Sequence, residues 1–168
     1  TDVRFTSSGG ECSLNGLYIG GGRQHIDHHT CVDHAVPHCA SRQLYKGVLG
    51  GTSKAVFNGR IHIHKDAQRS DSGMSNRNLL LSDKAVINTK PELEIYADDV
   101  KAAHGTTVGQ LDEQSIHYMR TRGIPPKDAE RILTSAFVAD ALGELGHESL
   151  VELLQAHIES RLDMVIKG

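Results

Sequence analysis

Hydrophobic and polar residues alternate in short runs along the first two thirds of the chain, a rhythm that is typical of β-strands. Gly, Asn, Asp and Ser separate the runs, and no amphipathic stretch of helical length lies between them. A β-sandwich and a β-solenoid would both produce this rhythm. The predicted strands occupy residues 14–19, 25–34, 42–48, 54–63, 85–89, 93–96 and 101–108.

Internal similarity favours the solenoid. Residues 14–19 (LNGLYI) resemble residues 57–62 (FNGRIH), so an apolar-Asn-Gly pattern returns after 43 residues. Because the turns of a solenoid stack equivalent positions above one another, this echo predicts that Asn15 and Asn58 occupy equivalent corners. Asn-Gly is also the commonest hairpin turn, so the sandwich stays open as an alternative.

The period of the apolar residues becomes helical after residue 108. Asp112 can cap a helix that runs to Arg122 and ends at Gly123. A pair of prolines at 125–126 suits the first turn of a second helix. The sequence therefore predicts a helical segment after the β-region.

Two glycines, Gly143 and Gly146, separate the second helix from a third. Three short helices have too little apolar surface to fold independently, so they must dock on the β-region or on a partner. The apolar positions are Ile132, Leu133, Ala136 and Phe137 in the second helix, and Leu150, Val151, Leu154, Ile158 and Leu162 in the third.

Composition excludes several classes of function. A formal charge of −3 and a pI near 6.4 give no basic field for nucleic acid, and the absence of Trp leaves few stacking platforms. No apolar run approaches the length of a membrane span, and no signal peptide opens the chain. Cys12, Cys31 and Cys39 are irregularly spaced, which fits a reducing compartment. Because the chain enters a strand-like run directly after Thr1, we expect further strands to precede it.

Potential metal ligands are densest between residues 25 and 39. On an extended strand, alternate residues share a face and lie about 7 Å apart, which lets two imidazoles reach one ion. A transition-metal site is one interpretation. The other, which the lack of zinc-type spacing favours, is a polar outer face with Ile26 and Val32 on the inside. The potential ligands are His25, His28, His29, Cys31, His34, His38 and Cys39, and Asp27 and Asp33 would share the face of His25 and His29.

A second His-x-His, His62 and His64, alternates with Ile61 and Ile63. This alternation predicts inward isoleucines and a solvent-facing row of histidines, with metal ligation as the less favoured alternative. No G-x-S-x-G motif and no phosphate-binding loop is present, which argues against a serine hydrolase and against nucleotide binding.

His104 differs from the other histidines because it lies among small residues in the last strand-like run before the helices. Small neighbours allow another chain to approach closely and leave the imidazole as the one reactive group. A histidine hydrogen-bonded at a domain junction is the alternative.

Several long motifs resemble the SufB/SufD family of iron–sulfur cluster assembly scaffolds, and specifically its SufD branch. They are TKPELEIYADDVK at 89–101, AHGTTVG at 103–109, LDEQ at 111–114 and YMRTRGI at 118–124, with SRQLYKG at 41–47 and AVFNG at 55–59 upstream. The resemblance implies a mainly β protein: a right-handed parallel β-helix over residues 1–108, with its front turns missing, and a helical segment over residues 109–168.

The resemblance also implies a non-enzymatic scaffold subunit that pairs with SufB and binds the ATPase SufC. Clusters would be built on that complex before transfer to apoproteins, so we expect a transient cluster at the interface with SufB and no tightly bound cofactor. The expected location is the cytoplasm, or the plastid in a plant or alga, and a homodimer is possible when the subunit is alone.

In the family, the histidine of the AHGT run lies at the interface with SufB, where a nascent cluster forms with a SufB cysteine. His104 matches that position. Many relatives carry a cysteine where this chain has Ala102. SufB has a cysteine near the position of Asn76 and a His-Glu pair where this chain has His104 and Gly105, so both departures favour SufD. The helices resemble the SufC-docking segment, with Ile132, Leu133, Phe137, Leu150 and Leu154 as the expected contact residues.

Two alternatives remain. One is a metal-dependent or polysaccharide-active enzyme on a β-solenoid that uses the histidine cluster, although the scarcity of aromatic residues removes the usual sugar-stacking platforms. The other is a self-associating, SufB-like scaffold.

Overall fold

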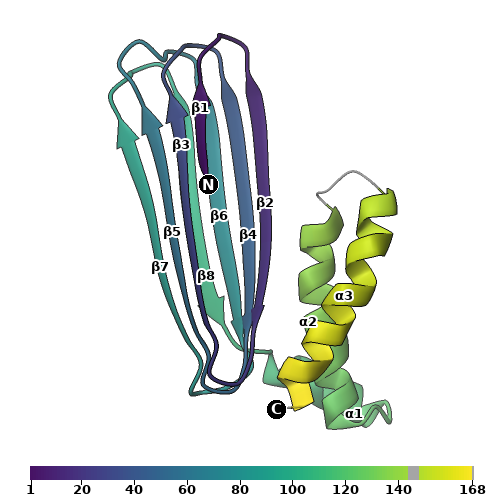
Figure 1. The fold of residues 1–168 in the computed structure, drawn as a ribbon. Coiled ribbons are helices and arrows are strands. Elements are labelled where there is room, and N and C mark those ends of the chain that lie inside the picture. Colours follow the sequence, from purple (N-terminus) through teal and green to yellow (C-terminus); the bar gives the residue numbers. More distant parts are fainter. Residues whose placement is uncertain (144–147, 168) are drawn as a thin grey trace.

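The computed structural model describes residues 1–143 and 148–167, which form strands followed by helices (Figure 1). The strands are β1 (Asp2–Phe5), β2 (Glu11–Gly20), β3 (His25–His34), β4 (Ala40–Leu49), β5 (Lys54–Ile63), β6 (Asp71–Leu80), β7 (Val86–Ile95) and β8 (Lys101–Gly109). The helices are α1 (Glu113–Thr121), α2 (Pro126–Gly143) and α3 (Glu148–Lys167).

The strands build a parallel β-solenoid. Odd-numbered strands form one sheet in the order β1-β3-β5-β7, and even-numbered strands form the other in the order β2-β4-β6-β8. Each pairs in parallel with the strand two places further along, at an offset of 29 to 32 residues. Ile61 and Ile63 are fully buried between the sheets, as the alternation predicted. The solenoid is confirmed, and the antiparallel sandwich is excluded.

The predicted corner positions of Asn15 and Asn58 are wrong. Both lie within strands of different sheets, because 43 residues correspond to about one and a half turns of the solenoid. The echo has another cause. A Cβ at Gly16 would overlap the Tyr45 ring, and a Cβ at Gly59 would overlap the Met74 sulfur. Gly16 therefore makes room for a large side chain of the next turn, and Gly59 for one from the facing sheet.

Two of the predicted strand assignments also differ from the structure. The prediction missed β6, because its inward residues are mainly polar: Ser72, Asn76 and Asn78 are buried beside Met74. The predicted strands at 85–89 and 93–96 are one strand, β7, which contains Pro91. Proline is tolerated there because β7 is the edge strand of its sheet.

Buried polar groups inside the solenoid satisfy one another. The Tyr18 hydroxyl donates to Asn78 Oδ1 and accepts from Asn76 Nδ2 at 3.1 Å, and Asn78 Nδ2 donates to Asn76 Oδ1 at 2.7 Å. Burial raises the pKa of Tyr18 to about 12. Asn78 Nδ2 also donates to the Thr107 carbonyl at 3.3 Å. The network thus ties β2 and β6 to β8, the last strand.

The helical segment begins as the sequence predicts. The Asp112 carboxylate accepts hydrogen bonds from the backbone amides of Gln114 and Ser115, and Gly123 takes a positive φ of 84° after α1. α2 ends at Gly143, whereas Gly146 lies outside the described residues. No helix in the described part of the chain combines the length and apolar character needed to cross a membrane.

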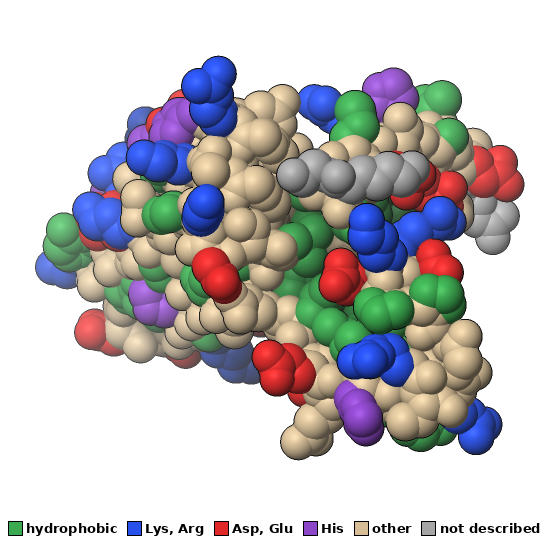
Figure 2. Space-filling view, turned by 90° about the horizontal axis from the view of Figure 1, so that it is seen from below, with side chains coloured by type: hydrophobic (Ala, Val, Ile, Leu, Met, Phe, Trp, Pro, Cys, Tyr) green, Lys and Arg blue, Asp and Glu red, His purple; other side chains and the backbone are tan. Residues whose placement is uncertain are grey.

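Helices α2 and α3 lie against the outer face of the even-numbered sheet, beside β2 and β4 (Figure 1). Val48 of β4, Val138 of α2 and Leu162 of α3 form the buried centre of this contact. Seen from the end where α1 lies, hydrophobic side chains gather between the solenoid and the helices (Figure 2). The C-terminal end of α3 is seated by Val165, whose side chain would contact a Cβ added at Gly21 or Gly50.

The predicted apolar face of α2 needs a correction. Its buried residues are Ala129, Thr134, Val138 and Ala141, whereas Ile132 is 47% exposed and Ala136 is exposed. The helix is packed between a sheet and another helix, so small residues on its tightest side are buried while a larger side chain faces solvent.

A buried lysine joins the two parts of the molecule. Lys46 points outward from β4, is 2% exposed, and donates from Nζ to Asp140 Oδ2 at 2.6 Å and to the Phe137 carbonyl at 2.7 Å. The Phe137 ring lies 4.6 Å from the same nitrogen. The hydrogen bond and charge of Lys46, together with Arg77, lower the pKa of Asp140. α2 is thereby held at one position on the sheet.

Replacing Asp140 by Ala is expected to lower the free energy of unfolding by about 1–3 kcal/mol, because it leaves the Lys46 ammonium buried without its carboxylate. Adding Lys46→Met should recover most of that loss, since the buried charge is then gone. Urea unfolding measures both. Asp99→Ala, which removes an exposed ion pair with Arg69, is the control and should change the value by less than about 0.5 kcal/mol. Equal losses in the Asp140 and Asp99 variants would contradict this role of Lys46.

The same pair predicts an acid-dependent loss of stability. Because the folded-state pKa of Asp140 is lowered, its contribution is complete above the unfolded-state pKa of about 4 and disappears as the pH falls through the folded value. Asp140→Asn should therefore have a flatter stability profile than the native chain below about pH 4. Parallel profiles would contradict the assignment.

Candidate functional site

β8 forms one edge of the even-numbered sheet and, among the described strands, is hydrogen-bonded to β6 alone. His104 lies near its centre, opposite Met74. Met74 is buried inside the solenoid, and the parallel register places His104 in the same inward row. His104 is nevertheless exposed, because no described strand stacks beyond β8. The imidazole therefore lies at the open end of the solenoid.

The backbone of β8 is accessible as well. Ala102, Ala103 and Gly105 surround His104, and the strand contains no proline, so none of its backbone N–H donors is lost. The neighbouring edge strand β7 lacks one donor at Pro91. A long edge of small residues with free backbone groups is a template on which another strand can pair. Of the two edges of this last turn, β8 is the better suited.

Large apolar side chains are exposed on the same turn of the solenoid. Tyr96 is 63% exposed directly after β7, and Val108 is 48% exposed on β8. A second group lies on the helices. The first group is Val86, Ile95, Tyr96 and Val108; the second is Tyr118, Ile132, Leu150, Leu153 and Met164.

The donor set around His104 contains no thiol. Ala102 is the inward neighbour on β8, and Asn76 on β6 is engaged with Tyr18 and the Tyr45 carbonyl. The cysteines lie on or next to β2, β3 and β4, none of them on the β7–β8 turn. Among the described residues, no cysteine is therefore placed to join His104 as a thiolate ligand.

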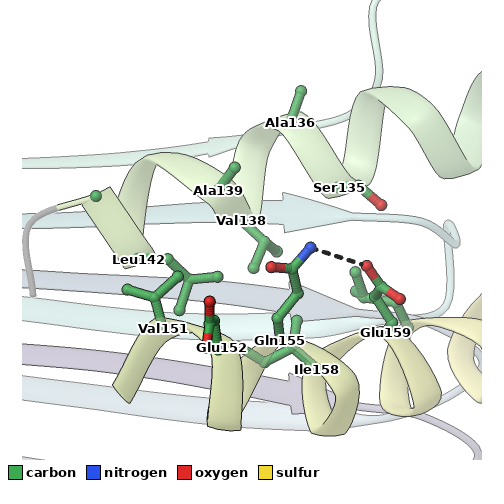
Figure 3. A pocket seen from close by; sticks show the side chains of 12 residues that line it. Ser135, Ala136, Val138, Ala139, Leu142, Val151, Glu152, Gln155, Ile158 and Glu159 are labelled. Atoms are coloured by element: carbon green, nitrogen blue, oxygen red, sulfur yellow. Dashed lines mark hydrogen bonds between the residues drawn. The ribbon is translucent and has the colours of Figure 1, made fainter. Parts of the chain in front are cut away.

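A groove with a volume of about 850 Å³ separates α2 from α3 (Figure 3). Val138 and Leu142 of α2 face Val151 and Ile158 of α3 across it. Glu152, Gln155 and Glu159 line it as well, and Gln155 Nε2 donates to Glu159 Oε1 at 3.2 Å. An apolar floor beside two carboxylates suits an apolar helix or loop that carries basic residues.

None of the five predicted docking residues lines this groove. Ile132 and Leu150 are exposed on the helices, and Leu133 is half-buried. Phe137 packs toward the sheet and Lys46, and Leu154 lines a smaller hollow between α3 and β2. Their contact with a partner remains a prediction.

The four histidines of β3 divide between its two faces, whereas His38 lies beyond the strand, where its φ is +60°. His25 and His29 face outward, and His29 pairs with Asp27 at 2.9 Å. His28 and His34 point inward, His28 beside Tyr18 and the fully buried His34 against Ser41 at 2.9 Å. Burial lowers the pKa of both inward histidines. The predicted faces are confirmed, but the interpretation of the cluster as an outer face holds only for half of it.

The sequence analysis did not predict the association of Asp33 with His62 and His64. Asp33 pairs in register with His62 across β3 and β5, and His64 follows β5 on the same side. The potential ligand atoms of these three side chains all lie within 4.8 Å of one another, and no other such group occurs among the described residues. The association follows from the 29-residue offset between β3 and β5. The sequence analysis used instead the 43-residue spacing of the Asn-Gly pattern, which does not align these residues.

Comparison with known proteins places the chain in a family. Residues 1–137 match the family model for the SufBD core domain of the SUF system for FeS cluster assembly. The iron–sulfur cluster assembly protein SufD of Escherichia coli (strain K12) is 38% identical over 162 residues, which are 96% of this chain and 38% of the relative.

Two further relatives agree. An iron–sulfur cluster assembly SufBD family protein of Synechocystis sp. is 40% identical over 145 residues, 86% of this chain and 32% of the relative. SufD of Bacillus subtilis (strain 168) is 32% identical over 146 residues, 87% of this chain and 33% of the relative. The chain thus spans about a third of the length of the curated relatives it matches. It belongs to the SufBD core family of iron–sulfur cluster assembly proteins.

Proposed function

We propose that this chain is part of a SufD-type scaffold subunit, which is not itself an enzyme, and that β8 pairs with SufB while the helices bind the ATPase SufC. The observation that carries the proposal is the open edge of β8 with His104 exposed at its centre. Family membership supports the scaffold role. The two separate groups of exposed apolar residues support two partners.

His104 would be a ligand for a cluster that is cargo rather than a resident cofactor. A neutral imidazole is a competent iron ligand, and it is exchanged more readily than a thiolate, which suits a cluster that must be handed on. Because no cysteine of this chain lies on the β7–β8 turn, the thiolate would come from SufB. The cluster would then form only where both subunits contribute ligands.

The groove between α2 and α3 would receive SufC. Its apolar floor lies on helices that are themselves fixed to the sheet by Lys46, so the contact can transmit force to the solenoid. The β8 edge would also allow two copies of this chain to pair when SufB is absent. We place the complex in the cytoplasm or the plastid; an Arabidopsis relative, 34% identical, is named as chloroplastic.

Replacing His104 by Ala should lower cluster yield on the complex with SufB and SufC on the order of tenfold, because one ligand is lost. The measurement is the absorbance and iron content after anaerobic reconstitution. We expect the complex still to form, because Ala is tolerated on an exposed strand of small residues. Size-exclusion chromatography checks this. His25→Ala removes an exposed histidine from β3 and is the matched control. Full cluster yield in an intact His104→Ala complex would contradict the role of His104.

Placing a charge in the groove should separate the two contacts. Val151→Asp is expected to weaken SufC binding by at least about tenfold, because it puts a third carboxylate beside Glu152 and Glu159 on an apolar floor. Binding to SufB should be unchanged. Ala156→Asp places the same charge at an exposed position of α3 that does not line the groove, and it should leave both contacts intact. Equal SufC affinities of the two variants, measured by calorimetry, would contradict docking in the groove.

A further inference from the structure

Three potential metal ligands meet on the outer wall of the odd-numbered sheet, away from His104. Asp33 Oδ1 lies 2.7 Å from His64 Nε2 and 3.3 Å from His62 Nδ1. The two imidazole rings lie 4.2 Å apart, centroid to centroid, and are tilted by 40°. One carboxylate oxygen is therefore shared by two ring nitrogens.

These separations are those of ligands that surround one ion. With metal–nitrogen and metal–oxygen distances of about 2.0–2.1 Å, tetrahedral ligand atoms lie roughly 3.3 Å from one another and cis octahedral ones about 3.0 Å. A transition-metal ion could thus take the place of these two contacts without a rearrangement of the strands, with each neutral imidazole carrying its proton on its other ring nitrogen. Two imidazoles and one carboxylate are donors that suit Fe²⁺, Zn²⁺ and Co²⁺ rather than Mg²⁺ or Ca²⁺.

The surroundings hold the three side chains while leaving them accessible. Asp33 is 19% exposed and its second oxygen is 3.3 Å from Arg4 Nε, so the carboxylate is oriented with Oδ1 toward the histidines. The Tyr96 ring packs edge-on against His62 at 5.5 Å. Glu94 pairs in register with His62 on β7, so the row Asp33–His62–Glu94 crosses three neighbouring strands. The Glu94 carboxylate lies beside Arg60, with Oε1 3.9 Å from Nη1.

We propose that Asp33, His62 and His64 form a site for a divalent first-row transition-metal ion on the outer wall of the solenoid. The inference does not depend on the proposed scaffold function, since it follows from the geometry of this cluster. The alternative is a purely structural role, in which the three side chains form a hydrogen-bonded network that stabilises the ends of β3 and β5. That role predicts no specific metal binding.

The test uses the protein without a polyhistidine tag, stripped with EDTA and dialysed. The protein is titrated with Co²⁺, with binding monitored by visible absorption, and separately with Zn²⁺, with binding measured by calorimetry. Each ion should bind with high affinity at a stoichiometry of one ion per protein. His62→Ala and His64→Ala should each weaken this equivalent by at least about tenfold. Asp33→Asn keeps the side-chain volume and a hydrogen-bond acceptor, and it should likewise weaken binding and shift the Co²⁺ spectrum. The Asp33→Asn variant provides the test if a histidine variant fails to fold.

The matched control is His29→Ala, which removes another outward histidine of the same sheet together with its pair to Asp27. It should leave the affinity and the Co²⁺ spectrum unchanged. Absence of a stoichiometric equivalent in the native chain would overturn the proposal. So would an equivalent that survives in folded Asp33→Asn and His64→Ala variants, because the ion would then bind elsewhere.

Discussion

Parallel pairing between strands one turn apart is the constraint on which the rest of this structure depends. An offset of about 30 residues fixes which side chains stack above one another, because an antiparallel or shifted pairing would turn each strand over. It aligns Asp33 with His62 and Met74 with His104. It also creates an end, since the last strand in the stack keeps its outward backbone groups unpaired. The fold thus stacks inward side chains in rows that end exposed at β8. On the outer face it aligns polar side chains across neighbouring strands.

The helices answer a different requirement. The even-numbered sheet has an apolar outer strip centred on Val48, and α2 and α3 cover it with Val138 and Leu162. Apolar contacts alone would allow α2 and α3 to shift along the sheet. The buried Lys46 ammonium fixes their position, because it must lie beside Asp140. The groove between the helices is consequently presented at a fixed place relative to the solenoid.

Much of the fold could be predicted from alternation alone, and the failures have identifiable causes. β3 and β5 were predicted to the residue because polar outer positions alternate with apolar or aromatic inner ones. β6 was missed because Asn76 and Asn78 take inner positions that only their mutual hydrogen bonds make tolerable. His104 could be selected from its small neighbours and its family motif. The Asp33–His62–His64 group could not, since a 29-residue separation has no meaning until the turn length is known.

Hydrogen exchange on β8 tests the central claim, that the open edge of the solenoid is where the partner strand pairs. In the protein alone, the alternate amides of Lys101–Gly109 that β6 does not bind should exchange at rates typical of exposed backbone. Mass spectrometry after addition of SufB should show these amides becoming strongly protected, with α2 and α3 unaffected until SufC is added. If SufB binds with full stoichiometry and the exchange of β8 does not change, the interface lies elsewhere and the account of this edge is wrong.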